Sequence, residues 1–367
     1  MKKLNILVNA YFAHNLGDDL FLKVLFDRYQ NVEWYLMTSD INYKKNFKNY
    51  KNVKIIRSMN FKVGSRSINL FNKINASFLK YKKYDALVII GGSIFMETSN
   101  WQVKLENRSN LPAQFERNGK KVFIVGANFG PFTDELFIKK HKEFFKGIDD
   151  ICFRDTYSYS LFNDLPNIRY APDVVFNLKM KEGGKPSKKR VGFSLINLKK
   201  RKNLSNYYDV YNEKIKLLIE KYIDQGYEVN CFSFCEKEGD LEVINQIKQS
   251  ISPGKKDEII IHNYEGNIDD FLSKFNECQV IIGTRFHSII LALMNKQELF
   301  PIIYNEKTAN VLSDIKMSIH SCDILDLKDA DLDYIQTKAT KNILKDISKV
   351  KKAAGYQFNK LDEFMSH

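Results

Sequence analysis

The fold class is decided by the stretch V-I-I-G-T-R-F-H-S-I-I-L-A-L, which runs from Val280 to Leu293. Its first three residues are apolar and β-branched and end at Gly283, which is typical of a buried parallel strand. From Ile289 the apolar residues continue without a breaker, as in a helix that packs on a sheet. The stretch therefore predicts a strand, a turn and a helix in succession, which is the repeating unit of an α/β fold.

Arg285 and His287 lie at the predicted junction between this strand and this helix. Open α/β sheets bind ligands at the carboxyl ends of their strands, and the N–H groups at a helix start favour anions. Arg285 adds a permanent, planar charge for a carboxylate or phosphate, and His287 can move protons near neutral pH. We interpret the pair as a site. An ion pair for Arg285, and a capping or core role for His287, would explain the same residues.

Length and composition favour two domains. The chain has 367 residues, more than one hydrophobic core usually serves, and its 44% apolar and 13% aromatic residues can fill two cores. We expect an N-terminal domain over 1–182, a C-terminal domain over 190–333, and a helical tail over 334–367 that packs back on the body. The apolar positions of the tail share one helical face, so contact with anionic lipid is the alternative.

Strand and helix signals alternate along both expected domains. Strands are predicted at 4–10, 32–37, 53–57, 86–90, 121–126, 150–154, 191–196, 228–234, 258–261 and from 280 onward. Helices are predicted at 18–29, 68–81, 133–146, 211–225, 241–250 and 268–276. This alternation predicts parallel sheets with helices on both faces, that is, two Rossmann-like domains facing a cleft and joined by a breaker-rich linker over 181–189.

Charge and cysteine usage limit the partners and the compartment. The formal net charge of +13 points to anionic partners, such as phosphorylated metabolites or an anionic membrane surface. No nucleic-acid motif surrounds the basic stretches, so nucleic acid is not expected. The five cysteines lack zinc spacing, and no stretch approaches the roughly 20 apolar residues of a membrane span. We expect a cytoplasmic protein, at most peripheral at the inner face of the membrane.

Small residues and amides follow three predicted strands of the first domain. They are Asn15, Gly17, Asp18, Gly91, Gly92, Ser93 and Asn128. Glycines at such places let a ligand approach the main chain, and the carboxyl ends of parallel strands meet at one edge of a sheet. We interpret these residues as a floor for a sugar or a phosphate, although a helix cap explains Asp18 equally well.

Arg154 is a further candidate ligand contact. It leaves a buried strand near the same edge of the sheet, where a cation is costly unless it meets an anion. That anion is either a ligand or a carboxylate of the chain, and Asp155 and Asp173 are the candidates. In the first case Asp173 would orient Arg154.

Two groups of residues can reach the Arg285 site from other strands. Tyr304 and Lys307 follow the next strand along the chain, and the basic loop 197–202 follows the first strand of the second domain. Each can line the same edge with positive charge. A surface position for Lys307 and a solvated loop at 197–202 are the alternatives.

In order along the chain, these motifs resemble those of the polysaccharide pyruvyl transferase family. They are N-x-G-D at 15–18, G-G-S at 91–93, N-F-G-P at 128–131, R-D at 154–155, P-D-V-V-F at 172–176 and G-T-R-F-H-S at 283–288. The most specific is R-F-H, where the family usually shows R-L-H. Tyr304 with Lys307 fits a further family pattern, and Ser93 stands where a glycine is common. The resemblance spans most of the chain.

The resemblance implies a fold like that of the GT-B glycosyltransferases and an enzyme that moves the pyruvyl group of phosphoenolpyruvate onto two hydroxyls of a sugar. The product would be a pyruvate ketal of a cell-surface or capsular polysaccharide, and the acceptor a free or lipid-linked saccharide. The first domain would hold the acceptor and the second the donor. Neither a metal nor another cofactor is expected.

The resemblance also implies roles for single residues. His287 would be the catalytic acid or base, Arg285 would hold the donor's carboxylate or phosphate, and Arg154 would be a second anion contact. Donor contacts are further expected at Gly283, Thr284, Ser288, Tyr304 and Lys307. Two other functions remain open: a GT-B glycosyltransferase that uses a sugar nucleotide, and a non-catalytic protein that binds anionic glycan or nucleic acid.

Overall fold

The computed structural model describes residues 3–57, 60–63, 66–69, 83–180, 188–201, 203–315, 320–342 and 346–366. The chain folds into two compact units. Unit 1 consists of Met1–Phe12, Phe21–Asn177 and Lys351–His367, and unit 2 consists of Ala13–Leu20 and Leu178–Val350. Each unit is therefore assembled from segments that are distant in the sequence.

Unit 1 is built on a seven-stranded parallel sheet. In sheet order, the strands are β3 (Val53–Arg57), β2 (Glu33–Thr38), β1 (Asn5–Ala10), β6 (Ala86–Ile90), β7 (Lys121–Ala127), β8 (Asp150–Phe153) and β9 (Ile168–Tyr170). Counted along the chain, this order is 3-2-1-4-5-6-7, so it reverses between β1 and β6. Such a reversal is the topological switch point of a doubly wound Rossmann fold.

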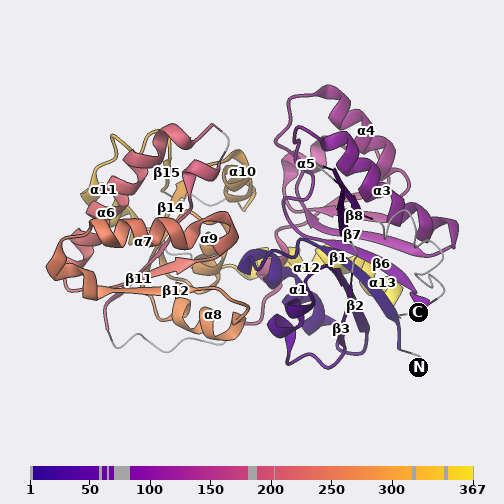
Figure 1. Cartoon of the computed structure of the whole chain (residues 1–367), viewed down its shortest axis with the longest axis horizontal. Coiled ribbons are helices and arrows are strands. Elements are labelled where there is room, and N and C mark those ends of the chain that lie inside the picture. The colour runs from indigo at the N-terminus through magenta and orange to yellow at the C-terminus, as the bar shows by residue number, and fades with distance from the viewer. Residues whose placement is uncertain are drawn as a thin grey trace. The chain divides into compact units, whose positions relative to one another are not determined.

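Helices cover both faces of this sheet (Figure 1). They are α1 (Leu16–Arg28), α3 (Trp101–Arg117), α4 (Glu135–Phe145), α5 (Thr156–Ser160) and the 3₁₀ helices η1 (Ile41–Phe47) and η3 (Val174–Asn177). On one face, Phe115 of α3 and Phe145 of α4 join the core. On the other, the ring of Phe123 lies 5.5 Å from that of Phe364. Because both faces are covered, strands such as β6 are buried at every position.

A short antiparallel hairpin follows β3. Its strands are β4 (Asn60–Val63) and β5 (Arg66–Asn69), and residue 61 faces residue 68 in the ladder. The helix predicted over 68–81 is therefore wrong at its start, because residues 68 and 69 pair with β4 instead. The rest of that predicted helix lies outside the described residues, as does most of the predicted linker, over 181–187.

Unit 2 repeats the same topology with a six-stranded parallel sheet. In sheet order, the strands are β12 (Ile259–Asn263), β11 (Glu228–Ser233), β10 (Arg190–Ser194), β13 (Val280–Gly283), β14 (Glu298–Ile303) and β15 (Cys322–Asp323). Their order along the chain is 3-2-1-4-5-6, so the switch point lies between β10 and β13. The stretch from which the fold class was predicted therefore supplies one side of this switch point.

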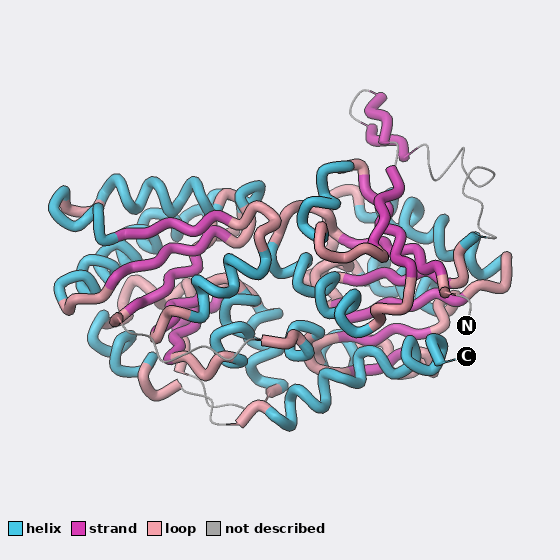
Figure 2. The backbone as a smooth tube through the Cα atoms, turned by 90° about the horizontal axis from the view of Figure 1, so that it is seen from below, coloured by secondary structure: helices cyan, strands magenta, loops and turns pink. Residues whose placement is uncertain are grey.

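Helices also cover both faces of the second sheet, and Figure 2 shows them on either side of its strands. They are α6 (Tyr208–Asp224), α7 (Asp240–Ser250), α8 (Ile268–Asn276), α9 (Phe286–Met294), α10 (Glu306–Asp314), α11 (Leu332–Ala339) and the 3₁₀ helices η4 (Leu198–Lys200), η5 (Ser205–Tyr207), η6 (Glu236–Glu238) and η7 (Pro253–Glu258). In α8 the buried residues Ile268, Phe271, Leu272 and Phe275 recur at helical spacing. This apolar stripe packs the helix on the sheet.

The expected tail over 334–367 is divided between the two units. Its first part is α11, whose Ile335 and Ala339 are fully buried in the core of unit 2. Its second part is α12 (Ser348–Gly355), η8 (Tyr356–Phe358) and α13 (Asn359–Ser366), most of which belongs to unit 1. The apolar face of α11 is thus used for packing in the protein, which removes the reason for placing it on lipid.

The last segment is fixed in unit 1 by buried polar contacts. Gln357 is fully buried, accepts a hydrogen bond from the main-chain N–H of Gly126 at 3.0 Å and donates to the carbonyl of Ala171 at 2.7 Å. Arg28 donates through Nε to Asp362 at 2.8 Å. The boundary expected at residue 333 therefore does not coincide with a boundary between the units.

The predicted strands and helices agree with the structure to within three residues at each end, apart from the 68–81 segment and the tail. The fold class, two Rossmann-like domains, is confirmed.

Among the described residues, the helices lack the combination of length and apolar character that a membrane span requires.

Candidate functional site

The Arg285 segment lies at the switch point of unit 2. Ser194, the last residue of β10, pairs there with Gly283, the last residue of β13. Arg285 immediately precedes α9 and has an extended main chain, with φ −70° and ψ 128°. The predicted succession of strand, turn and helix is thus confirmed, and Arg285 lies at the carboxyl end of the sheet, where open α/β sheets bind ligands.

Buried hydroxyl groups fix the turn between β13 and α9. The hydroxyl oxygens of Ser194 and Ser288 are 2.5 Å apart, and Ser288 donates to the carbonyl of Arg285 at 2.6 Å. The hydroxyl oxygens of Thr284 and Tyr211 are 2.9 Å apart. Because buried polar groups hold a unique arrangement only when they are hydrogen-bonded, this network positions the main chain at residue 285.

Three of the expected donor contacts, Gly283, Thr284 and Ser288, belong to this network. Thr284 and Ser288 are fully buried, so their hydroxyl groups face the interior of unit 2. At Gly283 a Cβ atom would lie 3.0 Å from the Ser288 hydroxyl, so the glycine makes room for this packing. All three residues help to position the main chain at Arg285.

Arg285 is buried and is surrounded by carboxylates. It donates through Nε to Asp240 Oδ2 at 2.8 Å and through Nη2 to Asp240 Oδ1. Through Nη1 it donates to Glu238 Oε2 at 2.6 Å. Burial alone would lower the pKa of Arg285, but Asp240 and Glu238 raise it well above its ordinary value, so the guanidinium stays charged.

Arg201 shares Glu238 with Arg285. Its Nη2 donates to the same oxygen, Glu238 Oε2, at 2.5 Å. Burial alone would raise the pKa of Glu238, but the guanidinium groups of Arg285 and Arg201 outweigh it and lower the pKa to about 2. The carboxylate is therefore ionised throughout the physiological range.

Tyr304 and Lys307 lie at the same edge, as predicted. The guanidinium of Arg201 lies 5.7 Å from the centroid of the Tyr304 ring. Burial alone would raise the pKa of Tyr304, yet Lys307, Arg201 and Arg285 lower it below its ordinary value. A phenol responds in this way only where positive potential prevails, so cations outweigh the nearby carboxylates at this position.

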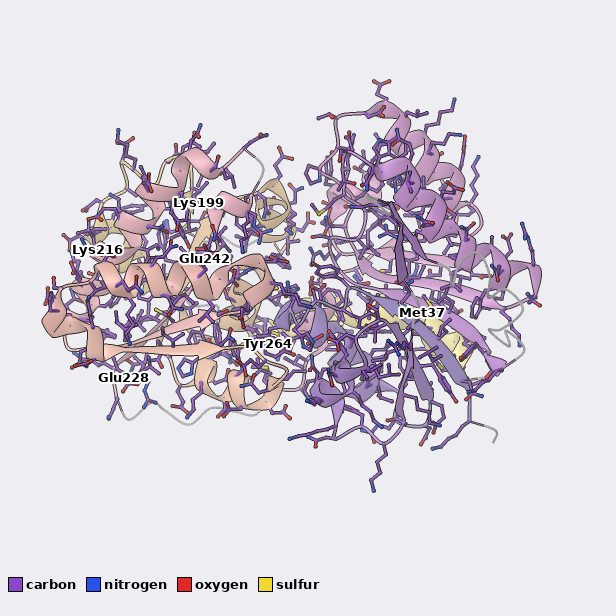
Figure 3. The ribbon with its side chains drawn as sticks, in the orientation of Figure 1. Met37, Lys199, Lys216, Glu228, Glu242 and Tyr264 are labelled. Atoms are coloured by element: carbon purple, nitrogen blue, oxygen red, sulfur yellow. The ribbon has the colours of Figure 1, made fainter. Side chains whose placement is uncertain are left out.

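Residues 13–20 belong to this site and not to the first domain, where they were expected. The main-chain N–H of Leu16 donates to the carbonyl of Phe234 at 3.0 Å. Tyr264, labelled in Figure 3, donates its hydroxyl to Asp19 at 2.5 Å, and both residues are buried. These contacts hold the segment after β1 on unit 2, which is the physical reason for the difference from the expected boundary.

The cap of α1 is Asn15 and not Asp18. Asn15 Oδ1 accepts the main-chain N–H of Gly17 at 3.0 Å, as an N-cap side chain does, whereas Asp18 lies in the first turn of the helix. The amide of Asn15 also donates to Glu238 Oε1 at 3.4 Å. The N-x-G-D motif is thereby connected to the guanidinium cluster.

His287 lies against Gly17. A Cβ atom on Gly17 would collide with the imidazole Nδ1 and lie 2.5 Å from Cε1. The ring of Phe286 lies 4.9 Å from that of His287, nearly perpendicular to it. Only a glycine at position 17 leaves room for this imidazole, so two motifs about 270 residues apart in sequence form one site.

Arg154 belongs to a second cluster, which lies in unit 1. It is only 2% exposed and donates to Asp173 Oδ2 at 2.9 Å and to Asn128 Oδ1 at 2.6 Å. A Cβ atom on Gly92 would lie 2.5 Å from its Nη1, so the guanidinium rests on the glycine main chain. The ion pair with Asp173 is thus observed, which is one of the two alternatives that the sequence left open for Arg154.

The other loop residues of unit 1 surround this cluster. Ser93 is half-buried and donates to Asn128 Oδ1 at 3.3 Å, and the main-chain N–H of Asn128 donates to the carbonyl of Gly92 at 2.9 Å. Gly91 has a φ of 147°, which favours glycine. The residues expected to bind an acceptor are therefore divided: 15–18 in unit 2, and 91–93 with Asn128 in unit 1.

Sequence reasoning missed Glu238 and Asp240 and left Arg201 unassigned within a basic loop. The signal that could have found the two acids is the stretch E-K-E-G-D at 236–240, which follows β11 at the same edge of the sheet and contains a glycine with φ 90°. Within the described ranges, no group of three or more histidine, cysteine, aspartate or glutamate side chains is arranged to hold a metal ion.

The paired Rossmann-like units define the class of protein, the GT-B fold. UDP-GlcNAc 2-epimerase from Methanocaldococcus jannaschii matches it with a TM-score of 0.61 at 13% identity, over 100% of this chain and 99% of the other. The Anabaena protein HepE, solved in complex with UDP and glucose, matches with a TM-score of 0.60 at 9% identity, over 100% of both chains. At such identities the likeness concerns the fold alone.

The sequence narrows this class to one family. Residues 15–306 match the polysaccharide pyruvyl transferase family, and the matched range contains both clusters. The amylovoran biosynthesis protein AmsJ of Erwinia amylovora is 21% identical over 293 residues, which are 69% of this chain. The match spans 65% of the length of that relative. The chain belongs to the polysaccharide pyruvyl transferase family, as its motifs predicted.

Proposed function

We propose that the chain transfers the pyruvyl group of phosphoenolpyruvate to two hydroxyl groups of a sugar during the biosynthesis of a cell-surface polysaccharide. The family and the relative named for amylovoran biosynthesis support this proposal. The observation that carries it is the meeting of residues 13–20 with the Arg285 segment at the switch point of unit 2. That meeting sets the imidazole of His287, two residues after Arg285 in the sequence, against Gly17.

The reaction needs one proton donor and a means of holding negative charge. A proton goes to the methylene carbon of phosphoenolpyruvate, a sugar hydroxyl adds to the central carbon, and a second hydroxyl displaces phosphate with cleavage of the C–O bond. Of the two hydroxyl protons, one ends on the new methyl group and the other on the released phosphate. His287 gives the first proton and recovers one from a hydroxyl group.

The cations of the site hold the two anionic groups of the donor. Arg201 and Lys307 lie at the edge of the sheet together with Tyr304, and positive potential prevails there. They would stabilise the charge that develops on the leaving phosphate. Arg285, which Asp240 holds in place at the carboxyl end of the sheet, would stabilise the same developing charge.

The remaining partners follow from this reaction. We propose a free or lipid-linked saccharide as acceptor, with contacts at Gly91 and Ser93 of unit 1. A lipid-linked acceptor would be met at an anionic membrane surface from the cytoplasmic side, to which a net charge of +13 is suited. Phosphoenolpyruvate is the co-substrate, and the scheme needs neither a metal nor another cofactor.

The test is acceptor-dependent release of phosphate from phosphoenolpyruvate. Galactosyl, glucosyl and N-acetylmannosaminyl acceptors would be tried with the wild type, His287→Ala and Arg285→Ala. We expect release with one of the acceptors and its loss in both variants. His320→Ala is the matched control, because it removes an imidazole of unit 2 from another part of the chain.

Binding of phosphoenolpyruvate, titrated by calorimetry in parallel, separates the outcomes. Binding without release means that the acceptor panel lacks the right sugar, and the panel is then extended. If phosphoenolpyruvate does not bind while a sugar nucleotide does, the proposal is wrong and the chain is a glycosyltransferase. If His287→Ala releases phosphate like the wild type, the role of His287 is wrong.

A further inference from the structure

We propose that Glu238 occupies, in the free protein, the place of the anionic ligand on Arg201 and Arg285, and that it moves away when a phosphate-bearing anion binds. The inference rests on the proposed function for the identity of that anion, phosphoenolpyruvate. It adds an exchangeable internal carboxylate to the site and assigns Arg201 as a ligand-binding residue.

Glu238 bridges two guanidinium groups through one of its oxygens. Glu238 Oε2 accepts hydrogen bonds from Arg285 Nη1 at 2.6 Å and from Arg201 Nη2 at 2.5 Å. One oxygen between two guanidinium groups is the arrangement in which arginines hold an oxygen of a phosphate or carboxylate ligand. The two side chains come from different strand ends of the sheet, Arg201 after β10 and Arg285 after β13. They converge on the one carboxylate.

The two carboxylates on Arg285 are held very differently. Asp240 is fully buried, binds Arg285 through both oxygens and accepts the main-chain N–H groups of Phe234 at 3.1 Å and Cys235 at 3.0 Å. The Glu238 side chain is 23% exposed and ends the single 3₁₀ turn η6. Asp240 is therefore a permanent partner, while rotation about the side-chain bonds of Glu238 can release it toward solvent.

The charge of the cluster also favours an anionic ligand. Without Glu238, Arg201 and Arg285 would face the single negative charge of Asp240. Burial is the largest single influence on the pKa of Tyr304 and raises it, yet Lys307, Arg201 and Arg285 together lower that pKa below its ordinary value even with Glu238 in place. A ligand with more negative charge than one carboxylate would therefore be held more strongly than Glu238.

Arg201 also has capacity for a further acceptor. Its Nε is buried and has no hydrogen-bond partner among the described residues. A buried N–H group of this kind is stabilised when an acceptor reaches it. An anion with several oxygens, such as a phosphate ester, can occupy the place of Glu238 Oε2 and bind this N–H as well.

Such an exchange explains how a site for anions stays folded when it is empty. One buried and one half-buried guanidinium group, Arg285 and Arg201, with one carboxylate would leave a charge without compensation at the end of the sheet, which is destabilising. Glu238 supplies the missing charge in the free protein. A ligand must then displace Glu238 from the guanidinium groups, so an anion with a smaller charge binds less tightly.

The test compares Glu238→Gln with Glu242→Gln. Both variants remove one carboxylate near the start of α7, but Glu242, labelled in Figure 3, pairs with Lys200 at 3.4 Å and accepts from Asn197. Calorimetry would measure the binding of phosphoenolpyruvate, pyrophosphate and inorganic phosphate. We expect at least one of these anions to bind Glu238→Gln on the order of tenfold more tightly than the wild type, and Glu242→Gln to stay within about twofold.

The outcomes separate the exchange from the proposed function. Unchanged or weaker binding by Glu238→Gln, together with phosphoenolpyruvate-dependent activity in the wild type, overturns the exchange and leaves the function standing. Tighter binding of pyrophosphate by Glu238→Gln without any binding of phosphoenolpyruvate supports the exchange and overturns the donor. If none of the anions binds either protein, both ideas are wrong.

A measurement on the wild type guards against a variant that fails to fold. When Glu238 leaves the guanidinium groups, its pKa returns from about 2 toward the ordinary value of 4.5. Binding near that ordinary pKa must then take up about half a proton. Calorimetry in buffers of different ionisation enthalpy detects this uptake, and Glu242→Gln should retain it. Its absence from the wild type overturns the exchange.

Discussion

Arg285 and Arg154 both follow the end of a parallel strand, both are buried, and they differ in what surrounds them. Arg154 in unit 1 meets one fully buried carboxylate, Asp173, and the amide of Asn128. Arg285 in unit 2 meets one buried carboxylate and a second that is partly exposed and shared with Arg201.

The difference separates a structural arginine from an arginine at a site. Removing a partner from the Arg154 cluster leaves a buried charge without compensation, so that cluster is fixed. The Arg285 cluster contains one partner that can be exchanged and one further cation. Arg154 organises the loops around Gly92 and Asn128 in unit 1, and we propose Arg201 as the second anion contact in its place.

The largest effect on stability is expected for Arg154→Ala. It leaves Asp173 buried and unpaired, which should lower the free energy of unfolding by about 3–5 kcal/mol. Urea denaturation followed by circular dichroism measures this. Lys121→Ala, which breaks the surface pair with Asp149 just before the neighbouring strand β8, should cost about 0–1 kcal/mol. An Arg154→Ala protein as stable as Lys121→Ala but inactive would make Arg154 a ligand contact and remove the contrast.

Among substitutions that keep all catalytic side chains, Gly17→Ala is expected to reduce the activity most. The added methyl group displaces the imidazole of His287, and such a displacement should reduce phosphate release about 100-fold, or about 2.7 kcal/mol in activation free energy. Gly254→Ala is the control, because a Cβ atom there meets nothing within 4 Å. Full activity in Gly17→Ala would show that the contact between the two motifs does not matter for the reaction.

The acid sensitivity of the two clusters should differ through Glu238. Since its pKa is lowered to about 2 in the folded protein, its contribution to stability is complete above the ordinary pKa of 4.5 and is lost as the pH falls toward 2. Glu238→Gln should therefore flatten the fall in unfolding free energy over this range by about 1–3 kcal/mol. Urea titrations at several pH values test it, with Glu242→Gln as control. Parallel curves for the wild type and Glu238→Gln would contradict the stabilising contacts of Glu238.

The smallest effect is expected for Ser93→Ala in unit 1. It removes a long hydrogen bond to Asn128 at the rim of the Arg154 cluster, which should change stability by at most about 1 kcal/mol. As a proposed acceptor contact, Ser93 should affect the KM for the acceptor a few-fold and leave that for phosphoenolpyruvate unchanged. Steady-state kinetics with each substrate varied in turn decides this, and an unchanged acceptor KM would remove Ser93 from the proposed acceptor contacts.

The sequence predicted what depends on local pattern. The alternation of apolar strands and amphipathic helices located β13 and α9 closely, because both are fixed by the period of their own residues. The motif containing Arg285 and His287 was correctly placed at the end of a strand. The family was recognisable from the same short motifs.

What could not be predicted depends on partners that are far away in the sequence. Asp240 lies 45 residues before Arg285, and no local pattern indicates that the two share hydrogen bonds. The position of Gly17 against His287 follows from the docking of residues 13–20 on unit 2, through Leu16 and Asp19, which is a tertiary event. Sequence order alone would assign residues 13–20 to unit 1, whereas they belong to unit 2.

The segments of the two units alternate along the sequence, which affects how the protein folds during synthesis and whether one unit can be produced alone. Residues 13–20 leave the ribosome early but find their place only when 178–350 has followed, and unit 1 receives 351–366 last. A gene fragment that encodes residues 178–350 would lack the segment that binds Phe234 and Tyr264. A stable half-protein therefore requires a circular permutation or the addition of the missing segment as a peptide.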